Sequence, residues 1–262
     1  MDLGIRGRLA LVCGASRGLG FACADRLAEA GAQIVLVARD AAKVEAAAAT
    51  LHARHGVPVR ALAADSTSDA GCAAILRECP APDILVLSGG WPTAAQRSGD
   101  ADASAVHAAL QSMLLAQMAL VARVAPGMAA RGFGRVVAIT SRLIKNPEWE
   151  LALPSVARLG LSAYLKAASR NAAWARRNVT FNSLLPGVFA SETQVAQTER
   201  LAREQHATIA AVEAERLALT PAGRWGVPDE FGACCAFLCS AHAGFINGQA
   251  LAVDGGAHGG LW

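Results

Sequence analysis

Seven short apolar segments alternate with stretches of helical periodicity along this 262-residue chain. Strands that are buried on both faces of a parallel sheet appear as continuous apolar runs, as residues 34–37 and 136–139 do here. The alternation therefore predicts an α/β fold, a doubly wound, seven-stranded parallel sheet with helices on both faces. The expected strands are Leu9–Cys13, Gln33–Ala38, Val57–Ala63, Asp83–Ser88, Gly134–Thr140, Val179–Leu185 and Gln249–Val253.

The chain is expected to form one domain over residues 1–262, because no linker, composition break or internal repeat interrupts the alternation. With 53% hydrophobic and 17% charged residues, it is not a disordered chain. Residues 191–220 differ from the rest of the chain in composition, because they have a helical pattern and are rich in Glu, Arg and Ala. Because they fall between the sixth and seventh strands, we expect them to form a mobile lid over a substrate pocket.

Charge and cysteine content limit the possible partners and surroundings. A formal net charge of only +3 gives no basis for nucleic-acid binding. The seven cysteines are an odd set without a Cys-x-x-Cys pair, so we expect buried, reduced thiols. The N-terminus lacks the basic and apolar regions of a secretory signal, which indicates a cytoplasmic location. The uncharged stretches 103–122 and 231–253 contain polar residues, which favours core or interface helices over membrane spans.

A glycine-rich loop follows the first expected strand and leads into an amphipathic helix over residues 21–30. Glycines permit a tight turn and let backbone N–H groups approach a pyrophosphate, and the positive end of the helix dipole favours the same anion. The sequence therefore predicts a Rossmann-type nucleotide site. Its first contacts are expected from Gly14, Ser16, Arg17, Gly18, Leu19 and Gly20.

Arg39, at the end of the second expected strand, indicates which nucleotide binds. An acidic residue at this point would accept the ribose 2′-hydroxyl of NAD, whereas arginine suits a 2′-phosphate. Arg17 could supply a second guanidinium, and Asp40 beside Arg39 is the counter-argument. NADP(H) is therefore the preferred cofactor, with NAD(H) as the alternative.

From Gly7 to Gly256 the chain resembles the short-chain dehydrogenases/reductases. The similarity includes the glycine loop and, further along, Ala64–Ser66, Leu87–Gly90, Asn182–Val188, Pro221–Gly226 and Val253–Gly256. The resemblance implies that Asp65 contacts the adenine, that Ser88 and Gly89 line the cofactor, and that Gly187 and Val188 pack near the nicotinamide. It also implies a homodimer or homotetramer, assembled through the helices that contain residues 103–122 and 154–175.

The resemblance implies catalysis in which a tyrosine donates a proton. A lysine one helical turn later, a serine and an asparagine assist this tyrosine. Ser141 ends the fifth expected strand, at the carboxyl edge of the sheet, and corresponds to the serine. Counting back from Asn182 assigns Val156 and Gly160 to the tyrosine and lysine positions. A similar count assigns Met113 to the asparagine position.

Other residues could replace the missing acid. Tyr164 lies two helical turns beyond Val156 and is a candidate proton donor, although a tyrosine packed at a helix interface is the commoner case. Arg142, Lys145 and Arg158 could each polarise a carbonyl group, or could be ordinary surface charges.

Metal and nucleophile chemistry have little support in the sequence. His52-x-x-His55 has no acidic or thiol partner at metal-ligand spacing, so no metal is assigned. No histidine stands beside Ser141 by sequence, so substrate orientation is the better interpretation than nucleophilic attack.

The sequence favours an NADP(H)-dependent oxidoreductase that acts on a carbonyl or alcohol with an atypical proton donor. Two alternatives remain open: a non-redox lyase or isomerase in the same pocket, and a catalytically silent nucleotide-binding subunit. A small-molecule substrate of fairly apolar character is expected from the predicted pocket walls, which are Trp91, Leu143, Trp149, Leu151 and Val188.

Overall fold

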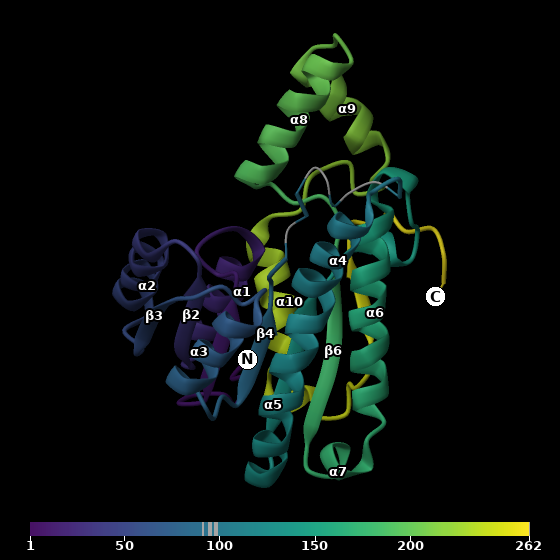
Figure 1. Ribbon diagram of the computed structural model, residues 1–262. Helices are drawn as coiled ribbons and strands as arrows, with labels where there is room; N and C mark the ends of the chain where they lie inside the picture. The colour runs from purple at the N-terminus through teal and green to yellow at the C-terminus, as the bar shows by residue number, and fades with distance from the viewer. Residues whose placement is uncertain (91, 94–95, 97–98, 262) are drawn as a thin grey trace.

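The computed structural model describes residues 1–90, 92–93, 96 and 99–261, without the side chains of residues 192 and 193. Within this part of the chain, seven parallel strands form one sheet in the order β3-β2-β1-β4-β5-β6-β7, with helices on both faces (Figure 1). The predicted fold class is therefore confirmed. The strands are β1 Leu9–Cys13, β2 Gln33–Ala38, β3 Val59–Ala63, β4 Ile84–Leu87, β5 Gly134–Ile139, β6 Val179–Pro186 and β7 Ala250–Val253.

The helices cover the sheet in two layers. α1, α2 and α10 pack on one face, and α3, α5 and α6 pack on the other. α8 and α9 form a hairpin that projects beyond one end of the sheet (Figure 1). The helices are α1 Gly18–Glu29, α2 Ala41–His55, α3 Asp69–Glu78, α4 Ala103–Leu110, α5 Ala116–Arg131, α6 Ala152–Ser169, α7 Ala172–Ala175, α8 Glu192–Glu204, α9 Ile209–Ala218 and α10 Pro228–Leu238.

The apolar strands separate two hydrophobic cores. Val12 and Leu36 point into the core beneath α1 and α10, whereas their strand neighbours Leu11 and Val35 point into the core beneath α3 and α5. All four residues are almost completely buried. Because successive side chains of a strand point to opposite faces, a strand between two helix layers must be apolar throughout.

The strand order reverses beside β1, and this reversal positions the site. β2 lies on one side of β1 and β4 on the other. The loops after β1 and β4 begin side by side at the carboxyl edge of the sheet, and the chains then continue to opposite faces of the sheet. A crevice at such a reversal is where open α/β sheets bind ligands. The backbones of the two loops are close, since a Cβ added at Gly14 would lie 2.1 Å from the carbonyl oxygen of Ser88.

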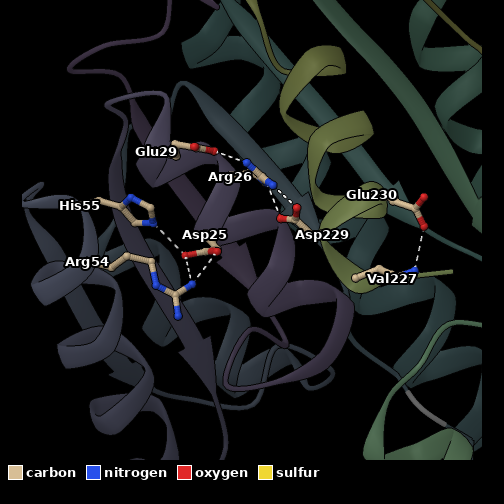
Figure 2. Close-up of polar contacts among 8 residues, drawn as sticks. All are labelled: Asp25, Arg26, Glu29, Arg54, His55, Val227, Asp229 and Glu230. Carbon is tan, nitrogen blue, oxygen red and sulfur yellow. Dashed lines mark hydrogen bonds and ion pairs between the residues drawn. The ribbon is translucent and has the colours of Figure 1, made fainter.

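Ion pairs connect α1 to both of its neighbours on the same face (Figure 2). The Asp25 carboxylate accepts hydrogen bonds of 2.8 Å from Arg54 and contacts His55 Nε2 at 2.8 Å. Arg26 pairs with Glu29 in its own helix and with Asp229 at the start of α10. The two histidines of the His52-x-x-His55 pair thus have structural partners, because His52 Nδ1 contacts the Val57 carbonyl oxygen at 2.8 Å.

The helix over Ala103–Arg131 is unusually apolar. It comprises α4, the π-helical turn η2 Gln111–Leu115, and α5. Among the described residues it is the one helix long and apolar enough, by length and composition, to cross a membrane. Leu120, Val121 and Val124 join the core, while Leu115 is 49% exposed. Part of this helix is therefore a core element, and the rest is an apolar surface.

All seven cysteines are free thiols, and six of them are buried. Cys23 of α1 and Cys235 and Cys239 of α10 are completely buried where the two helices pack together. Burial raises the pKa of the Cys13 thiol, at the end of β1, to about 12. These thiols behave as small apolar side chains.

Candidate active site

The first turn of α1 forms the glycine cradle. Helices α2, α3 and α4 are capped by the side chains of Asp40, Ser68 and Asp102, but Arg17 at the start of α1 makes no such side-chain bond. The N–H groups of this turn are therefore available to an anion, which the helix dipole also favours. Gly18 has φ +63°, and a Cβ added there would meet nothing within 4 Å. This open, uncapped turn fits a dinucleotide pyrophosphate.

Two other glycines of the loop allow close backbone packing. At Gly14 an added Cβ would collide with the loop after β4, and at Gly20 it would lie 2.4 Å from the Gly14 carbonyl oxygen. Ser16 and Leu19 are half-buried beside them, and Arg17 is exposed. The predicted cradle residues thus lie together at the carboxyl end of β1.

Arg39 and Asp40 follow β2 with different roles. Arg39 is exposed directly after the strand. The Asp40 carboxylate accepts a 3.1 Å hydrogen bond from the Lys43 backbone N–H and pairs with the Lys43 ammonium at 3.0 Å. These contacts with Lys43 lower the pKa of Asp40. Asp40 therefore caps α2, and the counter-argument that it would accept a ribose hydroxyl loses force.

The loops after β3, β4 and β6 lie at the same carboxyl edge of the sheet as the glycine loop. The Asp65 carboxylate accepts hydrogen bonds from the backbone N–H of Thr67, at 3.0 Å, and from its hydroxyl, at 2.6 Å. Ser88 and Gly89 are half-buried after β4, as are Gly187 and Val188 after β6. Gly187 is needed for close packing, since an added Cβ would lie 2.6 Å from the Asp254 Cα.

Ser141 lies just beyond the carboxyl end of β5 and is 9% exposed. Its Oγ accepts a 3.2 Å hydrogen bond from the Leu143 N–H and so caps the short helix η3 Arg142–Ile144. This bond uses a lone pair and leaves the hydroxyl proton available for donation. A substrate oxygen at the sheet edge is therefore a suitable acceptor.

The phase of α6 places its residues differently from the sequence count. Val156 is 60% exposed and lies on an outer stripe with Leu159, and a Cβ at Gly160 would meet Leu114 at 3.2 Å. Arg158 instead turns inward, and its Nη2 donates a 3.3 Å hydrogen bond to the Gly90 carbonyl oxygen in the loop after β4. Burial lowers the pKa of Arg158 to about 10. Pro154, one turn earlier, is buried.

The loop after β4 also contacts the apolar helix. Gln117 of α5 is 4% exposed, and its Nε2 donates to the Gly89 carbonyl oxygen at 3.2 Å. Met113 is completely buried within the π-helical turn η2, and a Cβ added at Gly90 would lie 2.7 Å from its Cγ. Two neighbouring carbonyl groups of this loop thus accept hydrogen bonds from α5 and α6.

Tyr164 is half-buried and packs against the core beneath α5. Burial raises the pKa of its phenol, whereas a general acid near neutral pH benefits from a lowered pKa. This environment is that of a packed interface tyrosine. Lys166, on the outer part of the same helix, donates a 3.1 Å hydrogen bond to the Gly248 carbonyl oxygen.

The predicted pocket walls do not form one apolar surface. Leu143 is buried, and Leu151 and Val188 are half-buried. Trp149 is 61% exposed, and its indole N–H donates to Asp100 at 3.2 Å. Trp91 lies outside the described residues.

The segment 191–220 contains the α8–α9 hairpin (Figure 1). Arg216 of α9 holds the hairpin together, because its guanidinium donates to the Thr198 hydroxyl and to the Gln194 side-chain oxygen, both in α8. Its guanidinium also lies 5.6 Å from the centre of the Trp225 ring. The hairpin is thus anchored by one arginine at its base.

Comparisons with known proteins identify the family. A family model described as enoyl-(acyl carrier protein) reductase matches residues 14–258. The gluconate 5-dehydrogenase of Gluconobacter oxydans is 34% identical over 259 residues, covering 96% of this chain and 95% of the relative. The 3-oxoacyl-[acyl-carrier-protein] reductase of Vibrio cholerae is 30% identical over 98% of this chain and 99% of its own. The chain therefore belongs to the short-chain dehydrogenases/reductases.

Solved structures agree with this assignment. The L-sorbose reductase of Gluconobacter frateurii, in complex with NADPH and L-sorbose, matches with a TM-score of 0.92 and 27% identity over 100% of both chains. A putative 2-deoxy-D-gluconate 3-dehydrogenase of Agrobacterium tumefaciens with bound NADP matches with a TM-score of 0.80 and 29% identity over 98% of both chains. The fold of this chain is thus shared with dinucleotide-dependent enzymes.

Two residues at the site have no distinct signal in the sequence. Arg158 is one of three candidate cations for which the sequence defines no contact, and Gln117 is one of several polar residues in an apolar stretch. Helical phase is the signal that could have found both, because Arg158 follows Pro154 at i, i+4 and Gln117 follows Met113 at the same interval.

Proposed function

We propose that this protein is an NADP(H)-dependent oxidoreductase that interconverts a carbonyl compound and its alcohol. The uncapped glycine turn of α1, with exposed Arg39 after the adjacent strand, is the observation that carries this proposal. Arg39 supplies the positive charge for a 2′-phosphate, because Asp40 is engaged as the cap of α2. The NADPH and NADP complexes of the structural relatives support the same cofactor.

We further propose that Pro154 and Arg158, not Val156 and Gly160, occupy the family's tyrosine and lysine positions. Both residues lie on the inward face of α6, and Arg158 reaches the loop after β4. The interval of four residues is the one expected for the pair. The chain contains a single tyrosine, Tyr164, and the fourth residue after it is Ala168.

The chain's own groups then have distinct roles. When bound, NADPH supplies a hydride to the carbonyl carbon, and NADP⁺ accepts one in the reverse direction. Ser141 donates a hydrogen bond to the substrate oxygen and orients the carbonyl group. Arg158 stabilises the negative charge that develops on this oxygen, since a buried guanidinium acts strongly at low local dielectric. Water supplies the proton, because neither Pro154 nor Arg158 replaces the phenol as an acid near neutral pH.

The loss of the phenol has a quantitative consequence. General acid catalysis typically contributes about 10²–10⁴-fold to a rate. We therefore expect slow turnover of simple ketones and faster turnover of carbonyl compounds with electron-withdrawing neighbours, whose reduced oxygen needs less help from a proton donor.

A second candidate function follows from the absence of the family's catalytic tyrosine. A chain without the tyrosine could bind the nucleotide and not use it, as a catalytically silent subunit. A non-redox lyase or isomerase is the remaining alternative, in which Ser141 and Arg158 would stabilise an enolate. Neither alternative predicts net oxidation of the nucleotide.

The deciding experiment is a fluorescence titration of the protein with NADPH and NADH, followed by assays with a carbonyl panel. We expect micromolar binding of NADPH that is tighter than that of NADH, and oxidation of NADPH with at least one activated carbonyl compound. Binding without oxidation across the panel would favour the silent subunit. No binding of either nucleotide would refute the proposed function.

A further inference from the structure

A polar cavity of ≈ 270 Å³ lies next to the segment that carries Ser141. Its lining comes from two distant parts of the chain, the η3 region and the C-terminal segment. The lining residues are Arg142, Asn146, Ala257, His258, Gly259 and Gly260. A cavity whose lining residues include an arginine, an asparagine and a histidine suits a ligand with an anionic group.

Arg142 is the charged group of this cavity, and its present partner is loosely held. Its Nη2 lies 3.7 Å from the Glu148 carboxylate, beyond the length of a normal hydrogen bond. The Arg142 side chain is 28% exposed and that of Glu148 is 45% exposed. A ligand carboxylate at hydrogen-bond distance can therefore compete with Glu148 for the guanidinium.

A second guanidinium adds to the positive charge. Arg216, at the base of the α8–α9 hairpin, uses its hydrogen bonds on Thr198 and Gln194. Burial and the nearby Arg142 lower the pKa of Arg216, while Glu213 acts in the opposite direction. Arg216 therefore adds to the positive charge near Arg142, although it is not one of the residues that line the cavity.

The C-terminal segment shapes the other wall. The Asp254 carboxylate accepts a 3.0 Å hydrogen bond from the Gly256 N–H and a 2.9 Å hydrogen bond from the His258 N–H. These bonds fold the chain back after β7 and commit Asp254 to the backbone. Gly259 and Gly260 then line the cavity without side chains, which leaves room for a ligand.

We propose that this cavity is a carboxylate subsite, and that the substrates are small oxo and hydroxy acids whose carboxylate binds Arg142. The proposal rests on the proposed function, since it concerns the substrate of the same site. A guanidinium presents a planar fork that matches the two oxygens of one carboxylate. Arg142 directly follows Ser141 in the sequence, so a carboxylate on Arg142 and a carbonyl group on Ser141 would belong to one short ligand.

The test compares acids with uncharged analogues of the same shape. Straight-chain oxo acids of three to six carbons are paired with their primary amides, and kcat/KM is measured with NADPH. Binding is followed separately by calorimetry and by the rise in melting temperature with saturating NADP⁺. We expect the best acid to exceed its amide by about 10- to 100-fold in both kcat/KM and affinity, since a hydrogen bond to a charged group contributes on that order.

Substitutions of Arg142 test whether the preference for acids over amides depends on its guanidinium. Arg142→Met is expected to lower the acid-to-amide ratio by about 10- to 100-fold, and Arg142→Lys to restore part of it, because lysine keeps the charge but not the fork. Arg200→Met is the matched control, because Arg200 lies in α8 and pairs with Glu204 in the same helix. This control is expected to leave the ratio unchanged.

Each outcome bears on a defined claim. If the amides bind and react as well as the acids, or if Arg142→Met keeps the full ratio, the carboxylate subsite is refuted while the oxidoreductase proposal stands. If the acids bind through Arg142 but NADPH is not oxidised, the subsite stands and the proposed redox function fails. If no acid of the panel raises the melting temperature, the subsite is refuted.

Discussion

Arg39 and Asp40 are neighbours at the end of β2, yet they have different surroundings. Asp40 caps α2 through the Lys43 N–H, whereas Arg39 is exposed, as the proposed contact with a 2′-phosphate requires. The division of roles depends on helix capping, because a residue before a helix satisfies N–H groups that have no partner inside the helix.

Replacement of Arg39 tests the cofactor assignment. Arg39→Asp is expected to weaken NADPH binding by about 10- to 100-fold, because it removes a charge-assisted bond to the 2′-phosphate and adds repulsion. NADH binding should improve. Fluorescence titration measures both affinities, with Arg176→Asp, an exposed arginine beside α7, as control. Unchanged NADPH affinity in Arg39→Asp would contradict the 2′-phosphate role.

Restoration of the proton donor tests the phase of α6. Pro154→Tyr with Arg158→Lys should raise kcat for reduction of a simple ketone by about 10²-fold or more, because the phenol then lies on the inward face. Val156→Tyr with Gly160→Lys is the matched comparison. It should give no gain, since Val156 is exposed and Gly160 faces Leu114. A gain in the second pair alone would reverse the assignment.

The exposed carboxylate of Glu230 stabilises the start of α10. Glu230 accepts a 2.8 Å hydrogen bond from the Val227 N–H, the contact drawn in Figure 2. It also pairs with Arg224, and the two bonds to that guanidinium are 2.6 and 2.9 Å long. Arg224 and the Val227 N–H lower the pKa of Glu230 from 4.5 to about 2.

This lowered pKa predicts a pH-dependent contribution to stability. A carboxyl group whose folded pKa lies below its unfolded pKa stabilises the fold above the unfolded value, and the contribution disappears as the pH falls through the folded value. The advantage of the wild type over Glu230→Gln in urea unfolding should therefore be constant above pH 4.5 and shrink as the pH falls to about 2. Glu45→Gln, on the exposed face of α2, serves as control. A difference that does not depend on pH would contradict the cap.

Arg135 joins elements at the end of the sheet opposite the site. It is completely buried in β5 and donates to the carbonyl oxygens of Ser240, Gly134 and Asn178 at 2.7–2.9 Å. Burial lowers the pKa of Arg135 to about 10. Phe133 packs against the guanidinium at 4.3 Å.

The loss of Arg135 should destabilise the whole fold. Arg135→Met removes a buried guanidinium that donates to three carbonyl groups, and we expect a loss of about 2–4 kcal/mol in the free energy of unfolding. Urea denaturation measures it, with exposed Arg170→Met as a control expected to change stability by less than about 0.5 kcal/mol. Equal stability of the two variants would show that other groups satisfy these carbonyls.

Helices α5 and α6 lie side by side (Figure 1), and α6 and the turn η2 before α5 expose apolar side chains. Leu115, Val156 and Leu159 are 49%, 60% and 51% exposed. Exposed apolar surface of this kind marks an interface more often than free surface. It supports the expectation of a homodimer or homotetramer.

Light scattering on the purified protein tests this expectation. We expect a mass of two or four chains, and a shift to smaller species in a Val156→Glu, Leu159→Glu double variant, because two charges would have to be buried. Leu219→Glu, at the 71% exposed end of α9, is the control. A stable wild-type monomer would contradict the predicted assembly.

The strands and the cradle could be predicted from sequence because their signals are local. Runs such as Ile34–Val37 must be apolar to lie between two helix layers, and β1 and β2 have the predicted bounds. Gly18 occupies a turn with positive φ at the start of a helix, and the residues on either side reveal it. Arg39 follows a recognisable strand end.

The inward face of α6 could not be predicted in the same way. A count from Asn182 selects Val156, but a difference of two residues turns a helical side chain by about 200°. Only packing against the sheet determines that Arg158 meets Gly90 and that Val156 meets solvent. The same holds for Gln117, whose partner Gly89 lies in the loop of a different strand.

The sequence by itself determined the sheet, the glycine turn and the positive charge after β2, because each depends on residues within one short segment. The tertiary structure decided which groups meet beyond the carboxyl edge of the sheet. Arg142 and His258 come from two distant segments, and only the folded chain brings them to one cavity. Turn conformation and strand patterning depend on neighbouring residues, whereas packing, ion pairs and hydrogen bonds between elements depend on the fold.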